Sequence, residues 1–275
     1  MYKDKLKAPI TLISHGRSGT SLLQNIFDAH PDISVAGETA DLIFGTWYSI
    51  SKIKGIVPGL FDENGKLVPW EERVALGVRA VFDQIFNLDR KYWMQKPISQ
   101  PFIMQFLKMQ EKNEKDWFNV YWSVLDQVFP EGKFITILRE PRDVVLSSKE
   151  YWGRDHANVW GNIATMARCI AHESSKVNYA VSFDELVQEP EPTLKKLFAH
   201  IDVPYSSDVL AALEHIYVPD QKKWKQDKSL FEDKIKRGFS RQKDWKDLDM
   251  SIVKTEDLEA IEKLWNKFGY SLNLN

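Results

Sequence analysis

The stretch from Pro9 to Ala29 constrains the fold of this chain more than any other part of its sequence. It begins with a short apolar segment and continues through a loop that contains Gly16 and Gly19. After the loop, apolar residues recur at the three- and four-residue spacing of a helix. Glycine tolerates the positive φ angles of a tight loop, and a following helix N-terminus presents unpaired N–H groups to an anion. We therefore predict a phosphate-binding loop between a strand and a helix.

The side chains of this loop suit an anion but not the usual nucleoside triphosphate. Arg17 supplies a cation, and Ser18, Thr20 and Ser21 supply hydroxyl donors. The triphosphatase pattern G-x-x-x-x-G-K-[ST] places a lysine directly after its second glycine, where it reaches the β- and γ-phosphates. Here Thr20 follows Gly19, so that lysine is absent. The alternative interpretation is an ordinary glycine turn between a strand and a helix.

Composition limits the class of protein and its partners. The 275 residues suffice for a sizeable core, and we expect a single domain over residues 1–275. Lys and Arg number 37 and Asp and Glu 39, so no overall field favours nucleic acid or a membrane as partner. A lone cysteine, Cys169, rules out an internal disulfide and suits a reducing compartment. With no signal core and no apolar run of about 18 residues, a cytoplasmic protein is expected.

Apolar patterning predicts strands that alternate with helices. The expected strands are 10–13, 33–35, 92–94, 133–138 and 178–183. The expected helices are 18–27, 71–86, 101–112, 117–128, 144–148, 158–174, 192–200, 206–215 and 255–268. This alternation predicts an α/β fold: a three-layer sandwich with a central, mostly parallel sheet. Residues 40–70 and 221–245 lack clear periodicity, and we expect them to form an acceptor wall or lid.

Polar residues follow several of the predicted strands. Glu38, Lys96 and Arg139 each stand just beyond an apolar segment, as the glycine loop does. Ligands of parallel α/β sheets bind outside the carboxyl ends of the strands, so these residues are expected to converge. Ser147 follows Arg139 by eight residues, and the pair suits a second anion site, because arginine matches phosphate geometry. Alternatives remain: Arg139 paired with Glu140 or Asp143, Glu38 as a capping or salt-bridged carboxylate, and Lys96 as a solvated lysine.

Two motifs about 120 residues apart resemble those of sulfotransferases that use 3′-phosphoadenosine 5′-phosphosulfate (PAPS). Gly-Arg-Ser-Gly-Thr-Ser at 16–21 resembles their 5′-phosphosulfate loop, and Leu-Arg-Glu-Pro-Arg-Asp-Val-Val-Leu-Ser-Ser at 138–148 resembles their 3′-phosphate motif. The nearest pattern is the tyrosylprotein sulfotransferase branch. In that branch the loop also leads through Asp-Ala-His-Pro, here 28–31, to a Gly-Glu pair, here Gly37-Glu38.

The resemblance implies a role for each matching residue. Glu38 corresponds to the proposed general base, and Lys96 and Arg17 to residues that stabilise the transferring group. The implied donor-binding residues are Gly16, Arg17, Ser18, Gly19, Thr20 and Ser21 for the 5′-phosphate and sulfuryl group, Arg139 and Ser147 for the 3′-phosphate, Phe183 near adenine, and Arg241 or Lys243 closing over the cofactor. Tyr151 departs from the pattern, because that branch has a basic residue there.

The predicted function is transfer of the sulfuryl group from PAPS to a hydroxyl acceptor, with PAP as product and no metal. A carbohydrate or small molecule is expected as acceptor rather than protein tyrosine. The missing cysteines and membrane anchor argue against an enzyme of the secretory pathway. Two other interpretations stay open: a P-loop nucleotide phosphotransferase and a catalytically silent nucleotide-binding protein. The sequence leaves the acceptor's identity and the oligomeric state undetermined.

Overall fold

The computed structural model describes residues 6–53, 58–62, 64–97, 114–214, 245, 248–272 and 274. The chain forms two compact units, each assembled from several segments. The first unit consists of Met1–Ile13, Asp32–Ile135 and His172–Asn178, and the second of Ser14–Pro31, Thr136–Ala171 and Tyr179–Asn275. The expectation of one domain over 1–275 stays a prediction.

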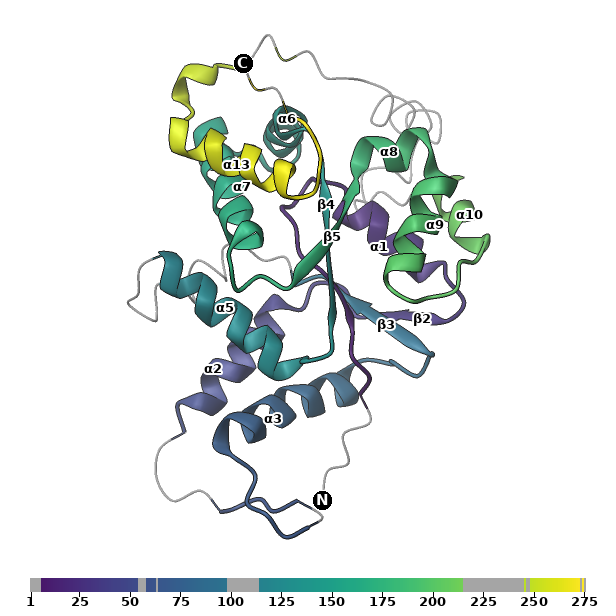
Figure 1. The fold of residues 1–275 in the computed structure, drawn as a ribbon, viewed down its shortest axis with the longest axis vertical. Coiled ribbons are helices and arrows are strands. Elements are labelled where there is room, and N and C mark those ends of the chain that lie inside the picture. Colours follow the sequence, from purple (N-terminus) through teal and green to yellow (C-terminus); the bar gives the residue numbers. More distant parts are fainter. Residues whose placement is uncertain are drawn as a thin grey trace. The chain divides into compact units, whose positions relative to one another are not determined.

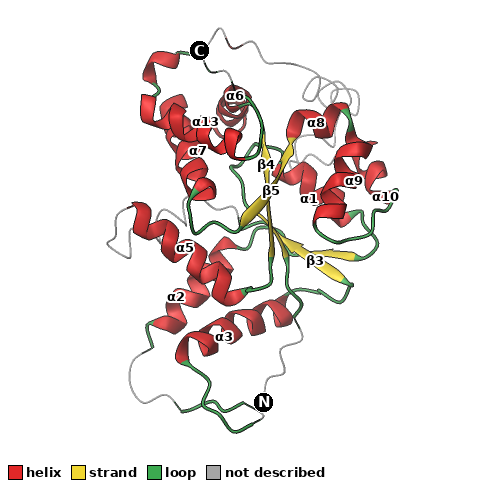
Figure 2. Cartoon of the chain, viewed as in Figure 1, coloured by secondary structure: helices red, strands yellow, loops and turns green. Residues whose placement is uncertain are grey.

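A five-stranded sheet flanked by helices confirms the predicted α/β fold (Figure 2). Its strands are β1 (Ile10–Leu12), β2 (Ile33–Val35), β3 (Tyr92–Gln95), β4 (Lys133–Leu138) and β5 (Val177–Ser182), in the order β2-β3-β1-β4-β5. The pairs β1–β3, β1–β4 and β2–β3 are parallel, as predicted. The strands are short. Most of their residues are buried, because other elements cover both faces of a parallel sheet.

The described residues of the first unit form four helical elements. They are a π-helical turn at Asp41–Gly45, α2 (Thr46–Ser51), α3 (Trp70–Ile85) and α5 (Glu114–Val128), and α3 packs against both α2 and α5. The core includes Phe82, Trp93 and Phe129, whose ring centroids lie 5.5–5.6 Å apart. The expectation that 40–70 is irregular is therefore wrong for residues 41–51. Ile43 and Phe44 are fully buried, and their packing stabilises helix in a segment too short to show periodicity.

The second unit carries the helices that surround the glycine loop. They are α1 (Thr20–Asp28), α6 (Pro141–Trp152), α7 (His156–Ala171), α8 (Phe183–Gln188), α9 (Pro190–His200), α10 (Asp208–Glu214) and α13 (Thr255–Lys267). Figure 1 shows α6, α7 and α13 together, and α7 packs against both of the others. A partly buried ion pair between Arg168 Nη1 and Asp257 Oδ1, 2.9 Å long, joins α7 to α13.

Most predicted boundaries agree with the structure within two to three residues. One difference affects a candidate site residue: Phe183 was expected at the end of a strand but begins α8. Ser182 causes this change, because its Oγ accepts a hydrogen bond from the Glu185 N–H and caps the helix. The predicted helix 101–112 lies outside the described residues, as does nearly all of segment 221–245.

Candidate active site

The glycine loop joins β1 to α1 through two residues with left-handed backbone. Gly19 is the N-cap of α1 with φ of 100°, and Arg17 has φ of 70°, a conformation that non-glycine residues rarely adopt. No side chain caps α1, and its first turn contains no acidic residue. The start of the helix and the positive end of its dipole therefore suit an anion.

Aromatic rings from distant segments close over both glycines of the loop. A Cβ on Gly19 would lie 2.5 Å from the Phe183 ring, and a Cβ on Gly16 would lie 2.7 Å from the Trp152 indole. Real Cβ atoms do not approach other heavy atoms so closely, so any larger residue at either position must displace a ring. Both glycines are thus required by packing, and Gly19 also by its backbone angle.

The Arg17 side chain lies against α6. Its Nε donates a hydrogen bond to Ser147 Oγ at 3.2 Å, and its guanidinium carbon lies 4.2 Å from the centroid of the Tyr151 ring. Burial lowers the pKa of Arg17, and the nearby Tyr151 and Glu150 oppose that shift. Arginine remains charged in proteins, so the loop carries a cation held by a hydroxyl group and an aromatic face.

Arg139 braces the same loop from β4. Its Nη1 donates to the Arg17 carbonyl at 3.1 Å, and its guanidinium carbon lies 4.4 Å from the Phe183 ring centroid. The Arg139 Nε is buried without a hydrogen-bond partner among the described residues. Burial lowers the pKa of Arg139, and the carboxylate of Asp143 is the largest opposing influence. A buried cation with an unused donor fits an anionic ligand.

The second unit therefore brings the two predicted anion motifs into direct contact. Arg17 of the first motif contacts both Arg139 and Ser147 of the second, across more than 120 residues of sequence. The alternative ion pairs of Arg139 do not form. Glu140 instead pairs with Arg142 at 2.8 Å, and Asp143 accepts from a tryptophan. The loop hydroxyls divide into buried Ser18 and Thr20 and exposed Ser21. Arg241 and Lys243 lie outside the described residues.

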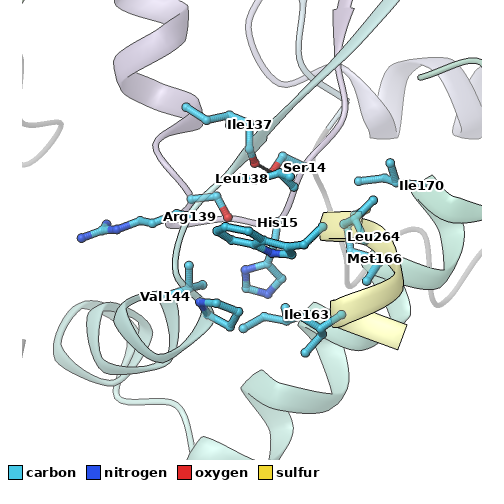
Figure 3. A pocket seen from close by; sticks show the side chains of 15 residues that line it. Ser14, His15, Ile137, Leu138, Arg139, Val144, Ile163, Met166, Ile170 and Leu264 are labelled. Atoms are coloured by element: carbon cyan, nitrogen blue, oxygen red, sulfur yellow. Dashed lines mark hydrogen bonds between the residues drawn. The ribbon is translucent and has the colours of Figure 1, made fainter. Parts of the chain in front are cut away.

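His15 lies directly beneath the loop, beside a cavity of about 30 Å³. Figure 3 shows the imidazole among apolar side chains of α7 and α13, such as Ile163 and Leu264. Its Nδ1 hydrogen-bonds the Gly16 carbonyl, so Nδ1 carries the proton, and Nε2 is buried without a partner among the described residues. Burial lowers the pKa of His15 to about 4. The residue is therefore neutral near pH 7, and it anchors the first residue of the loop.

The first unit places Glu38 beside Lys96. Lys96 Nζ lies 3.3 Å from Glu38 Oε1, with 6% of the lysine side chain and 63% of the glutamate side chain exposed. Burial lowers the pKa of Lys96, and Glu38 opposes the shift. The interpretation of Lys96 as a solvated lysine is wrong. Glu38 is salt-bridged, which agrees with one of the alternatives, yet most of its side chain is exposed to solvent.

A buried polar chain fixes the strand ends that carry this pair. Thr39 Oγ1 donates to Gln95 Oε1 at 2.9 Å, and Gln95 Nε2 donates to Thr11 Oγ1 at 3.2 Å. The Lys96 N–H also donates to the Gly37 carbonyl at 2.8 Å, which continues the β2–β3 pairing. These contacts place Glu38 and Lys96 at adjacent strand ends, as the sequence predicted for this part of the cluster.

Sequence reasoning overlooked the contributions of His15 and Trp152 and treated Tyr151 only as a departure from a pattern. A signal for Tyr151 was present, because it follows Ser147 by four residues and so shares its helix face. The position of His15 directly before the glycine loop gave no comparable signal, since its role depends on the burial of its ring.

Two further properties concern the described part of the chain alone. It contains no helix that is both long and apolar enough to cross a membrane. Nor does it bring three histidine, cysteine or acidic side chains together in a group suited to a metal ion. The absence of a metal requirement stays a prediction.

Comparison with known proteins agrees with the arrangement of these motifs. Residues 9–207 match the model of the family described as the sulfotransferase family. A candidate protein-tyrosine sulfotransferase of Caenorhabditis briggsae is 24% identical over 211 residues, which are 70% of this chain. The matched region spans 65% of the length of that relative.

Solved structures show the same fold. The sulfotransferase domain of the Synechococcus PCC 7002 olefin synthase has a TM-score of 0.56 at 18% identity, covering 99% of this chain and 100% of that domain. The sulfotransferase domain from the curacin biosynthetic pathway also scores 0.56, at 16% identity, with 98% and 99% covered. At these identities the likeness establishes the fold, and the family match extends over more than half of the sequence. This chain belongs to the sulfotransferase family.

Proposed function

We propose that this protein transfers the sulfuryl group of PAPS to a hydroxyl group of an acceptor and releases PAP. The observation that carries this proposal is the position of Arg17, which hydrogen-bonds Ser147 through its side chain and Arg139 through its carbonyl. These contacts join the motif assigned to the 5′-phosphosulfate with the motif assigned to the 3′-phosphate. A donor with anionic groups at both ends suits such a pair of motifs.

The loop fits the 5′-phosphosulfate. The uncapped start of α1, the guanidinium of Arg17 and the buried hydroxyls of Ser18 and Thr20 offer hydrogen-bond donors without a nearby acidic residue in the first turn of the helix. This donor set matches an anion held at a helix N-terminus.

Arg139 and Ser147 fit the 3′-phosphate. The unpartnered Nε of Arg139 and the Ser147 hydroxyl supply donors to such a group. Phe183 was assigned to adenine by resemblance. Its ring is buried and packs on Gly19 and Arg139, so we assign it the support of both anion sites. Contact of Phe183 with adenine and closure by Arg241 stay predictions.

The chemistry divides between the two units. In the transfer, the acceptor oxygen bonds to sulfur as the bond from sulfur to the 5′-phosphate oxygen breaks, and the hydroxyl proton passes to a base. We assign the base to Glu38, because its carboxylate is exposed and oriented by Lys96. Arg17 and the α1 N-terminus stabilise charge that develops on the leaving phosphate, and Lys96 supplies positive charge to the transferring group.

The acceptor class is the least constrained part of the proposal. The name of the C. briggsae relative concerns protein tyrosine. We nevertheless favour a carbohydrate or small-molecule hydroxyl, because a single buried cysteine, Cys169, suits a reducing compartment such as the cytoplasm rather than the secretory pathway. The oligomeric state stays undetermined.

Transfer from radiolabelled PAPS to sugars, phenols, lipids and a tyrosine peptide tests this proposal. We expect label in a sugar or phenol, in amounts that depend on the wild-type enzyme. Label found solely in the tyrosine peptide would contradict the acceptor class, and no transfer to any acceptor would contradict the activity. A phosphotransferase would instead be stabilised thermally by ATP with Mg²⁺, whereas we expect stabilisation by PAP without metal. A silent binding protein would bind PAP and transfer nothing.

A further inference from the structure

The carboxylate of Asp143 lies close to the proposed 3′-phosphate site. Asp143 belongs to the first turn of α6 and is buried. It follows Arg139 by four residues, and its charge is the strongest influence opposing the effect of burial on the pKa of Arg139. Burial raises the pKa of Asp184, and the charge of Asp143 raises it further. A carboxylate at this position competes with a phosphate for the guanidinium.

The side chain of Trp245 hydrogen-bonds the carboxylate of Asp143. Its indole Nε1–H donates to Asp143 Oδ1 at 2.9 Å. The indole ring in turn stacks under Arg142, whose guanidinium carbon lies 3.8 Å from the ring centroid. Arg142 is held by Glu140 through a 2.8 Å ion pair. Trp245 is therefore fixed in orientation from one face, with its N–H directed at Asp143.

The contacts of Arg139 show the consequence. Its hydrogen bond goes to the neutral carbonyl of Arg17, and its Nε stays without a partner. Within the described part of the chain no carboxylate lies in an ion pair with Arg139, although Asp143 follows it by four residues. The indole N–H and the N–H groups at the start of α6 both favour a carboxylate that stays on the helix. The Arg139 guanidinium is therefore not neutralised by Asp143, and its Nε–H remains a donor for an anion.

We propose that Trp245 is a positioning residue for the 3′-phosphate site: its indole N–H holds Asp143 away from Arg139 and so keeps that guanidinium available for an anion. This inference rests on the proposed PAPS donor. It assigns a role to a residue that lies more than 100 positions from Arg139 in the sequence and that acts on it through Asp143.

Isothermal titration with PAP and with adenosine 5′-monophosphate tests the inference, because the two ligands differ by the 3′-phosphate alone. Trp245→Phe keeps an aromatic ring under Arg142 and removes the N–H. We expect it to lower the PAP-to-monophosphate affinity ratio about five- to tenfold, the equivalent of one hydrogen bond of about 1 to 1.4 kcal/mol. Monophosphate affinity should stay within about twofold.

Rescue separates positioning from general structural damage. Asp143→Asn keeps an acceptor for the indole but removes the competing charge, so Trp245→Phe/Asp143→Asn should recover the affinity ratio of Asp143→Asn alone. Trp160→Phe is the matched control: Trp160 is a fully buried tryptophan of the same unit whose Nε1 has no partner among the described residues. It should leave the ratio unchanged, and thermal unfolding checks that every variant is folded.

Three outcomes would overturn the inference. An unchanged ratio in Trp245→Phe, or a lowered ratio that Asp143→Asn fails to restore, would show that the indole N–H does not act through Asp143. These results leave the proposed donor intact. A wild-type ratio near one would instead contradict the 3′-phosphate site itself, and with it the inference.

Discussion

The candidate site residues of the two units hold their cations in opposite ways. In the second unit, Arg17 and Arg139 bond a hydroxyl and a carbonyl and lie on aromatic rings, all neutral partners. In the first unit, Lys96 pairs with the carboxylate of Glu38. Cations with neutral partners keep their full field for an anionic donor, whereas Lys96 shares its charge with the carboxylate that it orients towards the proton of a neutral hydroxyl group. The difference supports donor binding by the second unit and proton transfer by the first.

The largest expected effect is the loss of turnover when the proposed base of the first unit is removed. Glu38→Gln keeps the shape of the side chain but cannot accept a proton. We expect kcat to fall about 10²- to 10⁴-fold, the usual contribution of a positioned general base. PAP affinity by titration should stay within about twofold. Glu71→Gln, an exposed carboxylate of the same unit, is the control. Turnover near the wild-type value, with chemistry shown to limit the rate, would exclude Glu38 as the base.

The second prediction uses pH to perturb the loop of the second unit. Because burial lowers the pKa of His15 from 6.5 to about 4, the unfolded chain binds the proton more readily. The stability that the buried, neutral His15 contributes is therefore complete above about pH 6.5 and is lost as the pH falls towards 4. The loss approaches about 3 kcal/mol in the free energy of unfolding. Urea titrations at several pH values measure it, and His15→Asn should flatten this acid dependence. An equally steep dependence in that variant would assign it to other groups.

The third prediction separates the two anion sites within the second unit. Arg139→Ala should weaken PAP binding about 10- to 150-fold, because a charged hydrogen-bond partner contributes about 1.5–3 kcal/mol. Adenosine 5′-phosphosulfate lacks the 3′-phosphate, so its affinity should fall only about fivefold, through the lost bond to the Arg17 carbonyl. Titration with both ligands measures the difference. Equal losses would mean that Arg139 only supports the loop.

The smallest effect tests the scaffold of the first unit. Thr39→Val removes the hydroxyl that donates to buried Gln95, which should cost about 1 kcal/mol in the free energy of unfolding. Turnover should fall with it, because the strand ends that carry Glu38 and Lys96 loosen, while PAP affinity should not change. Denaturant titration measures the free energy of unfolding, a sulfuryl-transfer assay measures turnover, and calorimetry measures PAP affinity. A loss of PAP affinity would show that the units do not act separately.

The sequence predicted those parts of the molecule that depend on local patterns. The five strands, the glycine loop and the anion motif around Arg139 follow from apolar runs and residue chemistry over a few positions. The contact between Arg17 and Ser147 spans 130 residues, and no local pattern reports it. Burial was equally invisible in the sequence: it excludes the alternative of Lys96 as a solvated lysine, and it makes His15 a neutral anchor. Helix at 41–51 was missed, because packing rather than periodicity stabilises it.

The central claim is that the second unit binds a donor with phosphate groups at both ends, and one titration tests it most directly. Wild-type protein is titrated with PAP and with adenosine 5′-monophosphate in the absence of metal. The account predicts that PAP binds at least about tenfold more tightly, from the 3′-phosphate contacts of Arg139 and Ser147. Equal affinity for the two ligands would contradict it.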